Sequence, residues 1–322
     1  MKMKGACVLC VLMIFLGIGF NAAAGEGDPI SVVVVNSYHW GYPWSDGIVQ
    51  GIEDVMIGYN IDLTHLQMDT KRNAGEQFKK EAAKKVQAWI QANKPELIIA
   101  VDDNASKYVI APYYKNSYSP VVFCGVNWDA SEYGFPCRNV TGMVEITPVT
   151  KILAQLKPHA KGSTIGFLGP DTLSSRKEAE NIEKYLNLKL VKYFSKDASD
   201  WKKGFAQLQD KADMLLLDSD GGLYAEKAAE LRSFALANTK IPAGTAFDFM
   251  APYALIAYCK SPEEQGRWAA QTAVKILKGA SPSSIPIAQN QEADLIINMP
   301  IAKKLGVTFP YDLLSTAEKI IE

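Results

Sequence analysis

The sequence predicts an α/β protein made of two similar lobes, each a parallel sheet flanked by helices, joined by a hinge. Short apolar runs rich in valine and isoleucine alternate with amphipathic segments along most of the 322 residues, which is typical of parallel βα units. The alternation comes as two successive series, and the chain is about twice the length of an average domain. No long Pro/Gly/Ser-rich linker separates the series, so the lobes must be joined by short crossings.

The first series occupies residues 28–143. We expect strands at 30–36, 61–67, 97–101 and 121–123, and helices at 45–57, 74–92 and 105–114. The first strand is an almost continuous valine run, as expected of a strand buried on both faces. The first helix has Ser45 as a candidate N-cap and places Ile48 and Ile52 on one face. These elements predict one compact α/β lobe.

The second series occupies residues 144–261. We expect helices at 148–156, 175–186, 201–209 and 224–235, and strands at 164–168, 188–194, 214–217, 241–244 and 254–258. A long helix at 262–277 and the remaining tail do not fit as an extension of the second sheet. The prediction is therefore an N-terminal lobe of residues 28–143 plus 262–322, and a C-terminal lobe of residues 144–261. Crossings near 143–147, 259–261 and 281–289 would form the hinge.

Residues 1–24 are typical of a secretory signal peptide. Lys2 and Lys4 precede a short apolar run at 8–20, and the small residues 22–24 provide a cleavage site. A membrane anchor is the alternative, but a spanning helix needs about 20 apolar residues. Cleavage after Ala24 predicts a soluble protein in the periplasm.

Charge and cysteine content restrict the partners and the redox state. The chain has 34 Lys+Arg and 35 Asp+Glu, and this balance gives no general attraction for nucleic acid. Of the five cysteines, Cys124, Cys137 and Cys259 follow the signal peptide. In an exported protein we favour a Cys124–Cys137 disulfide, with three separate thiols as the alternative.

Candidate ligand-binding residues follow the predicted strands, at the edge where the two lobes face each other. The loop 37–47 is strongly aromatic and predicts a stacking surface at Tyr38 and Trp40, although its aromatic residues could instead form a local core. Acidic and polar groups follow later strands, and they either cap helices or recognise an ammonium or hydroxyl group. The candidates are Ser37, Tyr38, Trp40, Asp103, Asn104, Asn127, Asp218 and Phe247.

The sequence carries no catalytic or metal signature that meets its structural context. His39, His65 and His159 do not lie beside a candidate nucleophile, and no G-x-S-x-G motif is present. Residues 218–220 resemble the start of a calcium loop, but Ala229 stands where the twelfth position requires an acid. We therefore expect no enzyme activity, no cofactor and no metal.

The end of the chain resembles the closing signature of a transporter family. Residues 276–279, 285–289, 293–298 and 302–310 resemble extracytoplasmic substrate-binding proteins of ABC transporters, in the family that includes tryptophan and tyrosine binders. The resemblance implies the type I periplasmic-binding-protein fold and ligand capture between closing lobes. By position it places ligand contacts at Ser37, Tyr38, Asp103, Asn104, Asn127, Asp218 and Phe247.

The resemblance also implies the partners. We expect a monomer that binds a small organic solute, such as an amino acid or an aromatic compound, and delivers it to an ABC permease in the inner membrane. The loop 38–44 departs from common members and resembles periplasmic sensory domains of signalling kinases. The alternative is therefore a ligand sensor that signals to a membrane receptor or histidine kinase.

Overall fold

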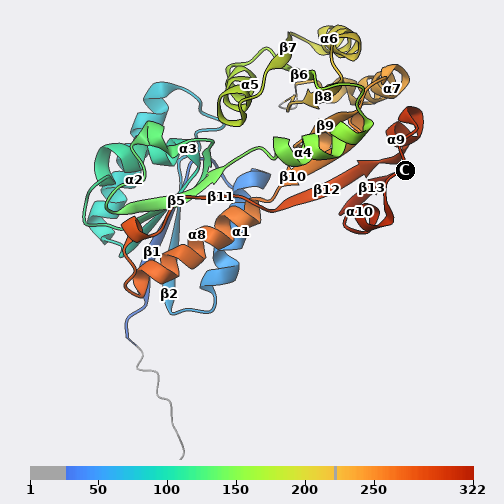
Figure 1. Cartoon of the computed structure of the whole chain (residues 1–322). Coiled ribbons are helices and arrows are strands. Elements are labelled where there is room, and N and C mark those ends of the chain that lie inside the picture. Colours follow the sequence, from blue (N-terminus) through green and yellow to red (C-terminus); the bar gives the residue numbers. More distant parts are fainter. Residues whose placement is uncertain (1–26, 221–222) are drawn as a thin grey trace, which may run out of the picture.

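The computed structural model describes residues 27–220 and 223–322. The predicted signal peptide at 1–24 lies outside this part of the chain. The described residues form two α/β lobes, each built on its own sheet (Figure 1). The α/β fold with two sheet-based lobes is therefore confirmed.

The first lobe contains a six-stranded sheet in the order β11-β5-β4-β3-β1-β2, with every neighbouring pair parallel. Its early elements are β1 (Ile30–Asn36), α1 (Pro43–Met56), β2 (Ile61–Gln67), α2 (Glu76–Asn93), β3 (Leu97–Val101), α3 (Asp102–Ala105), the π-helical η1 (Ser106–Tyr114), β4 (Val121–Asn127), η2 (Ala130–Tyr133) and β5 (Val140–Glu145). Three later elements return to it: α8 (Pro262–Leu277), η6 (Pro282–Ser284) and β11 (Ala288–Gln289).

The second lobe contains a seven-stranded sheet in the order β13-β12-β10-β9-β8-β6-β7. Its elements are α4 (Val149–Leu156), η3 (Lys157–His159), β6 (Ile165–Pro170), α5 (Leu173–Leu186), β7 (Leu190–Ser195), α6 (Ala198–Lys211), β8 (Met214–Leu217), η4 (Ala225–Lys227), α7 (Ala228–Asn238), β9 (Ala243–Thr245), η5 (Asp248–Tyr253), β10 (Ile256–Lys260), β12 (Ala293–Asn298), α9 (Met299–Leu305), α10 (Tyr311–Ser315) and β13 (Lys319–Ile321). Only the β10–β12 pair is antiparallel among these neighbours.

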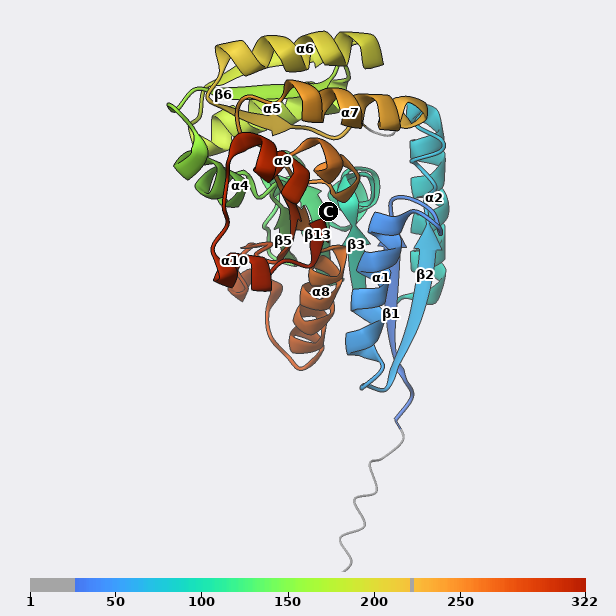
Figure 2. The same cartoon turned by 90° about the vertical axis from the view of Figure 1, so that its right-hand side faces the viewer.

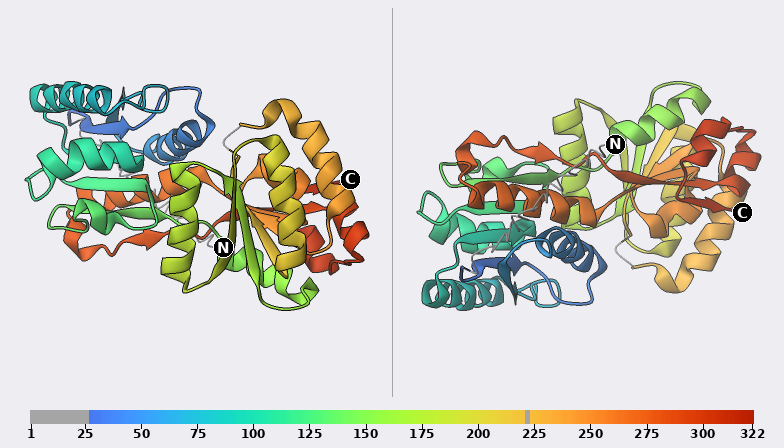
Figure 3. Two further views of the ribbon diagram at one scale, coloured as in Figure 1. Left: turned by 90° about the horizontal axis from the view of Figure 1, so that it is seen from above. Right: turned by 90° about the horizontal axis from the view of Figure 1, so that it is seen from below.

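Helices cover both faces of each sheet, as the views along the vertical direction show (Figure 3). In β1, Val33 and Val35 face a core shared with α2 and η1, whereas Val32 and Val34 face a core shared with α1 and α8. All four valines are fully buried. The continuous apolar run therefore reflects a strand that contributes side chains to two cores.

The end of the chain differs from the sequence-based prediction that residues 262–322 complete the first lobe. Helix α8 and strand β11 do join that lobe. Strand β12, however, pairs with β10, and β13 pairs with β12, so both extend the second sheet. The apolar residues of this tail explain the difference, because Leu295, Ile297, Ile301 and Phe309 pack in the second-lobe core.

The proposed Cys124–Cys137 disulfide is not present. Cys124, Cys137 and Cys259 are free thiols. Cys124 is buried in the core under α1 and α8, whereas Cys137 packs against the core on the opposite face of the same sheet. The loop after β4 therefore returns along the wrong face for a bond between the two sulfur atoms.

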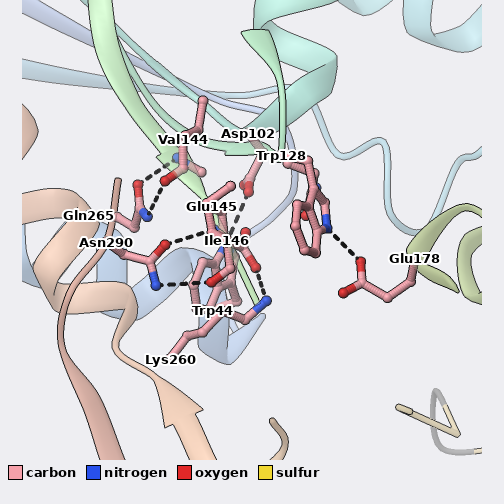
Figure 4. A network of polar contacts seen from close by, with 12 residues as sticks. Trp44, Asp102, Trp128, Val144, Glu145, Ile146, Glu178, Lys260, Gln265 and Asn290 are labelled. Atoms are coloured by element: carbon pink, nitrogen blue, oxygen red, sulfur yellow. Dashed lines mark hydrogen bonds and ion pairs between the residues drawn. The ribbon is translucent and has the colours of Figure 1, made fainter. Parts of the chain in front are cut away.

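Three short crossings connect the lobes: β5 to α4, β10 to α8, and β11 to β12 (Figure 1). The Asn290 side chain holds the first and third together, because its Oδ1 accepts from the Ile146 N–H at 2.7 Å and its Nδ2 donates to the Ile146 carbonyl at 3.2 Å. Gln265 of α8 accepts from the Gly125 N–H at 2.9 Å and donates to the Val144 carbonyl at 3.4 Å (Figure 4). The hinge is thus a bonded cluster of three chain segments.

Helices α1 and α8 approach closely on the side of the first lobe seen in Figure 2. A Cβ atom on Gly266 would overlap the Ile48 carbonyl oxygen, and one on Gly51 would overlap the Glu263 carbonyl oxygen. Both obstacles are backbone atoms, which cannot rotate away as a side chain would. The two glycines therefore set the spacing between these helices.

Gly266→Ala is expected to lower the free energy of unfolding by about 1–3 kcal/mol, the usual effect of overpacking a tight contact. Urea denaturation followed by circular dichroism would measure the change. Gly58→Ala is the matched control, because a Cβ there meets only the Val55 carbonyl oxygen at 3.9 Å. Equal stability of the two variants would contradict the predicted role of Gly266.

Candidate ligand-binding site

The strand order of both lobes places a topological switch point at the edge facing the other lobe. In the first lobe β1 lies between β2 and β3, and in the second β6 lies between β7 and β8. In open α/β sheets, ligands bind outside the carboxyl ends of the strands at such points. The residues that follow β1, β3, β6 and β8 are therefore the candidates for ligand contact.

Asp102, directly after β3, is the most deeply buried acid of the first lobe, with 2% of its surface exposed. Its Oδ1 accepts a hydrogen bond from Trp44 Nε1 at 3.1 Å, while its Oδ2 has no hydrogen-bond partner. Burial raises the pKa of Asp102 well above its ordinary value of 3.8, and the charges of Glu145 and Asp103 raise it further. Its backbone is left-handed, with φ of 67°.

Asp103 follows Asp102 in the first turn of α3. It accepts from Asn127 Nδ2 at 2.6 Å and from the Tyr133 hydroxyl at 2.7 Å. Burial raises the pKa of Asp103, although these hydrogen bonds oppose the shift. The structure thus brings two of the predicted residues, Asp103 and Asn127, into direct contact.

Ser37 and Asn104 form a second bonded group within the first lobe. The Ser37 hydroxyl donates to the Val101 carbonyl at 2.6 Å and accepts from the Ala105 N–H at 2.8 Å. Asn104 Nδ2 donates to Thr70 Oγ1 at 2.8 Å, and that hydroxyl donates to the Ser37 carbonyl. Both predicted residues therefore tie β1 to the start of α3.

The aromatic side chains of the loop after β1 lie in two different environments. The Tyr38 ring packs edge-on against Tyr42 at 5.2 Å, and the Lys71 ammonium lies 5.0 Å from its centre. Burial raises the pKa of Tyr38, and Asp102 and the neighbouring acids add to the effect. Trp40 lies instead on His65 of β2 and is 53% exposed.

A buried ion pair lies where the chain crosses between the lobes (Figure 4). Lys260, the last residue of β10, pairs with Glu145, the last residue of β5, and both side chains are about 10% exposed or less. The Lys260 ammonium also lies 5.6 Å from the Trp44 ring and 5.8 Å from the Phe247 ring. One cation is therefore held by a carboxylate and two aromatic side chains.

The pKa values of both Glu145 and Lys260 are raised, with different consequences for the charge of each group. Burial raises the pKa of Glu145 despite the adjacent Lys260. Burial lowers the pKa of Lys260, but Glu145, Glu178 and Asp218 outweigh it and leave that pKa above 10.5. Because three acidic residues raise its pKa, Lys260 stays protonated.

The second lobe contributes Asp218, which follows β8. A small cavity of about 20 Å³ is lined by Asp218, Glu178 of α5 and Phe247, together with apolar side chains such as Val149 and Ile152. This volume is about the size of one water molecule. Burial raises the pKa of Asp218 to about 7. Asp218 and Phe247 were both predicted from the sequence.

The lobes touch beside this cavity through Trp128, which follows β4. Trp128 Nε1 donates to Glu178 Oε2 at 2.8 Å, and the indole stacks on Tyr185 with ring centres 5.7 Å apart. The Tyr185 hydroxyl in turn donates to Asp129 at 2.7 Å. Figure 4 shows the Trp128 indole between the first-lobe strands and Glu178.

Sequence reasoning missed several groups that the structure places in this region. Asp102, Trp44, Glu145, Trp128, Glu178 and Lys260 were not among the predicted site residues. A charged residue at the end of an otherwise apolar strand was the available signal for Glu145 and Lys260. Helix α5 gave no signal for Glu178, because its position along the surface of that helix depends on how the lobes meet.

Two negative findings apply to residues 27–220 and 223–322. Within them, no cluster of three or more His, Cys, Asp or Glu side chains has the arrangement of a metal site. None of the helices there has both the length and the apolar character needed to cross a membrane.

Comparison with known protein families identifies the family of this chain. The model of the family described as ABC transporter substrate binding protein matches residues 30–321. The chain belongs to this family. Its members bind substrates outside the cytoplasm and are not enzymes. No curated protein matches the chain significantly.

Solved structures share the fold of this substrate-binding family member. The ligand-free, open structure of CD0873 from Clostridium difficile, a substrate-binding protein with adhesive properties, has a TM-score of 0.70 at 23% identity, covering 91% of this chain and 99% of that chain. The ABC domain from Streptococcus pneumonia in complex with L-Trp has a TM-score of 0.58 at 18% identity, covering 91% and 100%. A conserved domain protein from Vibrio cholerae has a TM-score of 0.58 at 19% identity, covering 90% and 99%. These likenesses confirm the type I periplasmic-binding-protein fold.

Proposed function

We propose that this substrate-binding protein captures a small organic solute between its two lobes. The observation that carries the proposal is the convergence of buried polar and aromatic groups from both lobes on the hinge ion pair. Asp102 and Trp44 come from the first lobe, and Asp218 and Phe247 come from the second. Burial of such groups stabilises no fold by itself, and a solute held between them would link the lobes.

In this proposal the protein then delivers the captured solute to an ABC permease. Residues 1–24 would direct export and be removed, and the protein would act as a periplasmic monomer. Short crossings let the lobes rotate about the hinge, and a solute that contacts both lobes favours the closed arrangement. A permease could then distinguish loaded from empty protein by the relative position of the lobes.

The test is a thermal-shift screen with amino acids, amines, nucleosides and small sugars, followed by titration calorimetry of each hit. We expect at least one solute to raise the midpoint and to reduce the radius of gyration in small-angle X-ray scattering. Phe247→Ala with Asp218→Asn should abolish the shift, whereas Asp210→Asn, in an exposed pair with Lys240, should preserve it. A hit whose shift survives the double variant would place binding elsewhere.

A further inference from the structure

The region between the lobes carries more negative than positive charge. Its carboxylates are Asp102 and Asp103 of the first lobe, Glu145 of the hinge, and Glu178 and Asp218 of the second lobe. Lys260 is paired with Glu145. Lys71, which weakly lowers the pKa of Asp102, has its ammonium over the Tyr38 and Tyr42 rings. Asp102 is neutral because burial raises its pKa, which leaves Asp103, Glu178 and Asp218 as acids of this region with no cation in direct contact.

Two buried carboxylate oxygens, one from each lobe, lack hydrogen-bond partners. They are Asp102 Oδ2 and Glu178 Oε1. The Asp102 side chain is almost completely buried, and its carboxyl group points toward Trp44 and Glu145 (Figure 4). Buried acceptors are nearly always satisfied in folded proteins. Burial raises the pKa of Asp102 and keeps its carboxyl group protonated. A hydrogen-bond donor from a solute would therefore satisfy Glu178 Oε1, because Glu178 lines the cavity beside Asp218.

The aromatic groups suit a positively charged solute as well. Trp44 and Phe247 already flank the ammonium of Lys260 at cation–π distances. Trp128 donates its N–H to the second oxygen of Glu178 and leaves the first one free. Aromatic rings and a carboxylate therefore already hold the ammonium of Lys260 within the protein.

A solute carboxylate would find little to bind. Lys260 is already neutralised by Glu145, and the Ser37 hydroxyl and Asn104 amide donate within the first lobe. The N-terminal end of α3 carries Asp102 and Asp103 themselves. An added carboxylate would also be repelled by the acids listed above.

We propose that the captured solute is an organic cation without a carboxylate group, such as an aliphatic or aromatic amine. The ammonium lies beside Glu178 and Asp218, which line the same cavity, and donates to the unpartnered Glu178 Oε1. The rest of the solute lies against Trp128 and Phe247. The proposal rests on the capture function proposed above and names the chemical class of solute for that same site.

Matched pairs that differ by one carboxylate test it. Tryptamine and tryptophan, phenethylamine and phenylalanine, agmatine and arginine, and cadaverine and lysine would each be titrated calorimetrically at pH 8. We expect at least one amine to bind ten times or more tightly than its amino acid. If an amino acid binds as tightly as its amine, or if no amine binds, the inference is overturned. Binding of an amino acid or sugar between the lobes would still leave the capture function standing, whereas a screen without any hit would overturn both.

Two variants locate the ammonium. Glu178→Gln keeps an acceptor for Trp128 but removes the charge, and it should weaken binding of the amine at least tenfold. Glu183→Gln is the matched control on the same helix, because Glu183 pairs with Lys192 at the surface. Equal loss in both variants, or no loss in either, would contradict the assignment.

Binding should also depend on pH through Asp218, whose pKa is about 7. Asp218 faces Glu178 of α5 and Lys260 of β10, together with the Ser175 hydroxyl and the Ser219 N–H. A cation favours the ionised carboxylate, so affinity for the amine should rise between pH 6 and pH 8. Asp218→Asn should flatten this rise; an unchanged profile would count against the proposed position of the charge.

Discussion

Lys260→Met is expected to lower the free energy of unfolding by about 3–5 kcal/mol, the usual effect of removing one partner from a buried ion pair. The reason is that Glu145 would remain buried with Asp103 and Glu178 nearby and no cation beside it. Methionine has nearly the length of lysine, so the variant leaves only a small void. Urea denaturation at pH 7, followed by tryptophan fluorescence, measures the loss.

The double variant Lys260→Met with Glu145→Gln is the control for this prediction. It removes both charges, so it should recover most of the stability that the single substitution loses. If Lys260→Met alone changes the free energy of unfolding by less than about 1 kcal/mol, the ion pair contributes less to stability than its burial implies. If the double variant is no more stable than the single one, the loss comes from packing around Lys260.

Asp102→Asn is expected to stabilise the protein, and the gain should grow with pH. Because burial raises the pKa of Asp102, the folded protein keeps a proton that the unfolded chain releases above about pH 4. Stability therefore falls as pH rises from 3.8 toward the raised pKa, by up to about 1.4 kcal/mol per pH unit. The neutral asparagine does not have this dependence.

Asparagine also fits the local structure. It tolerates the left-handed backbone at this position better than most residues, and its amide oxygen can accept the Trp44 hydrogen bond. Unfolding in urea at pH 4, 5, 6 and 7 would compare the variant with the wild type. Curves that stay parallel, as expected for the exposed control Asp210→Asn, would show that Asp102 is not held in its protonated form. A more stable variant that no longer binds solute would place the buried acid in the function of the protein.

The elements of both lobes could be predicted because their strands are buried on both faces. Valine runs such as 32–35 indicate a strand whatever the neighbouring elements are. The destination of the tail could not be predicted, because Leu295 and Ile297 suit either sheet equally well as apolar residues. Only the second-lobe core, with Phe309 packed beside them, decides between the two.

The candidate site was partly predictable for a similar reason. Residues after strands, such as Asp103 and Asp218, could be named because parallel strands all end at one edge of a sheet. The Glu145–Lys260 contact joins residues 115 positions apart, and Glu178 reaches Trp128 only through the way the lobes meet. Pairings of this kind depend on three-dimensional placement, which no local pattern in the sequence records.

The return of α8 to α1 has a consequence for how the protein is made. The second lobe, apart from the segment from β12 to β13, comes from one continuous stretch. The first lobe instead needs a helix that lies more than 200 residues after its partner. Contacts so distant in sequence form slowly, because a long loop must close first. A nascent chain therefore carries an unfinished first lobe, with the valines facing α8 uncovered, until almost its entire length has been synthesised.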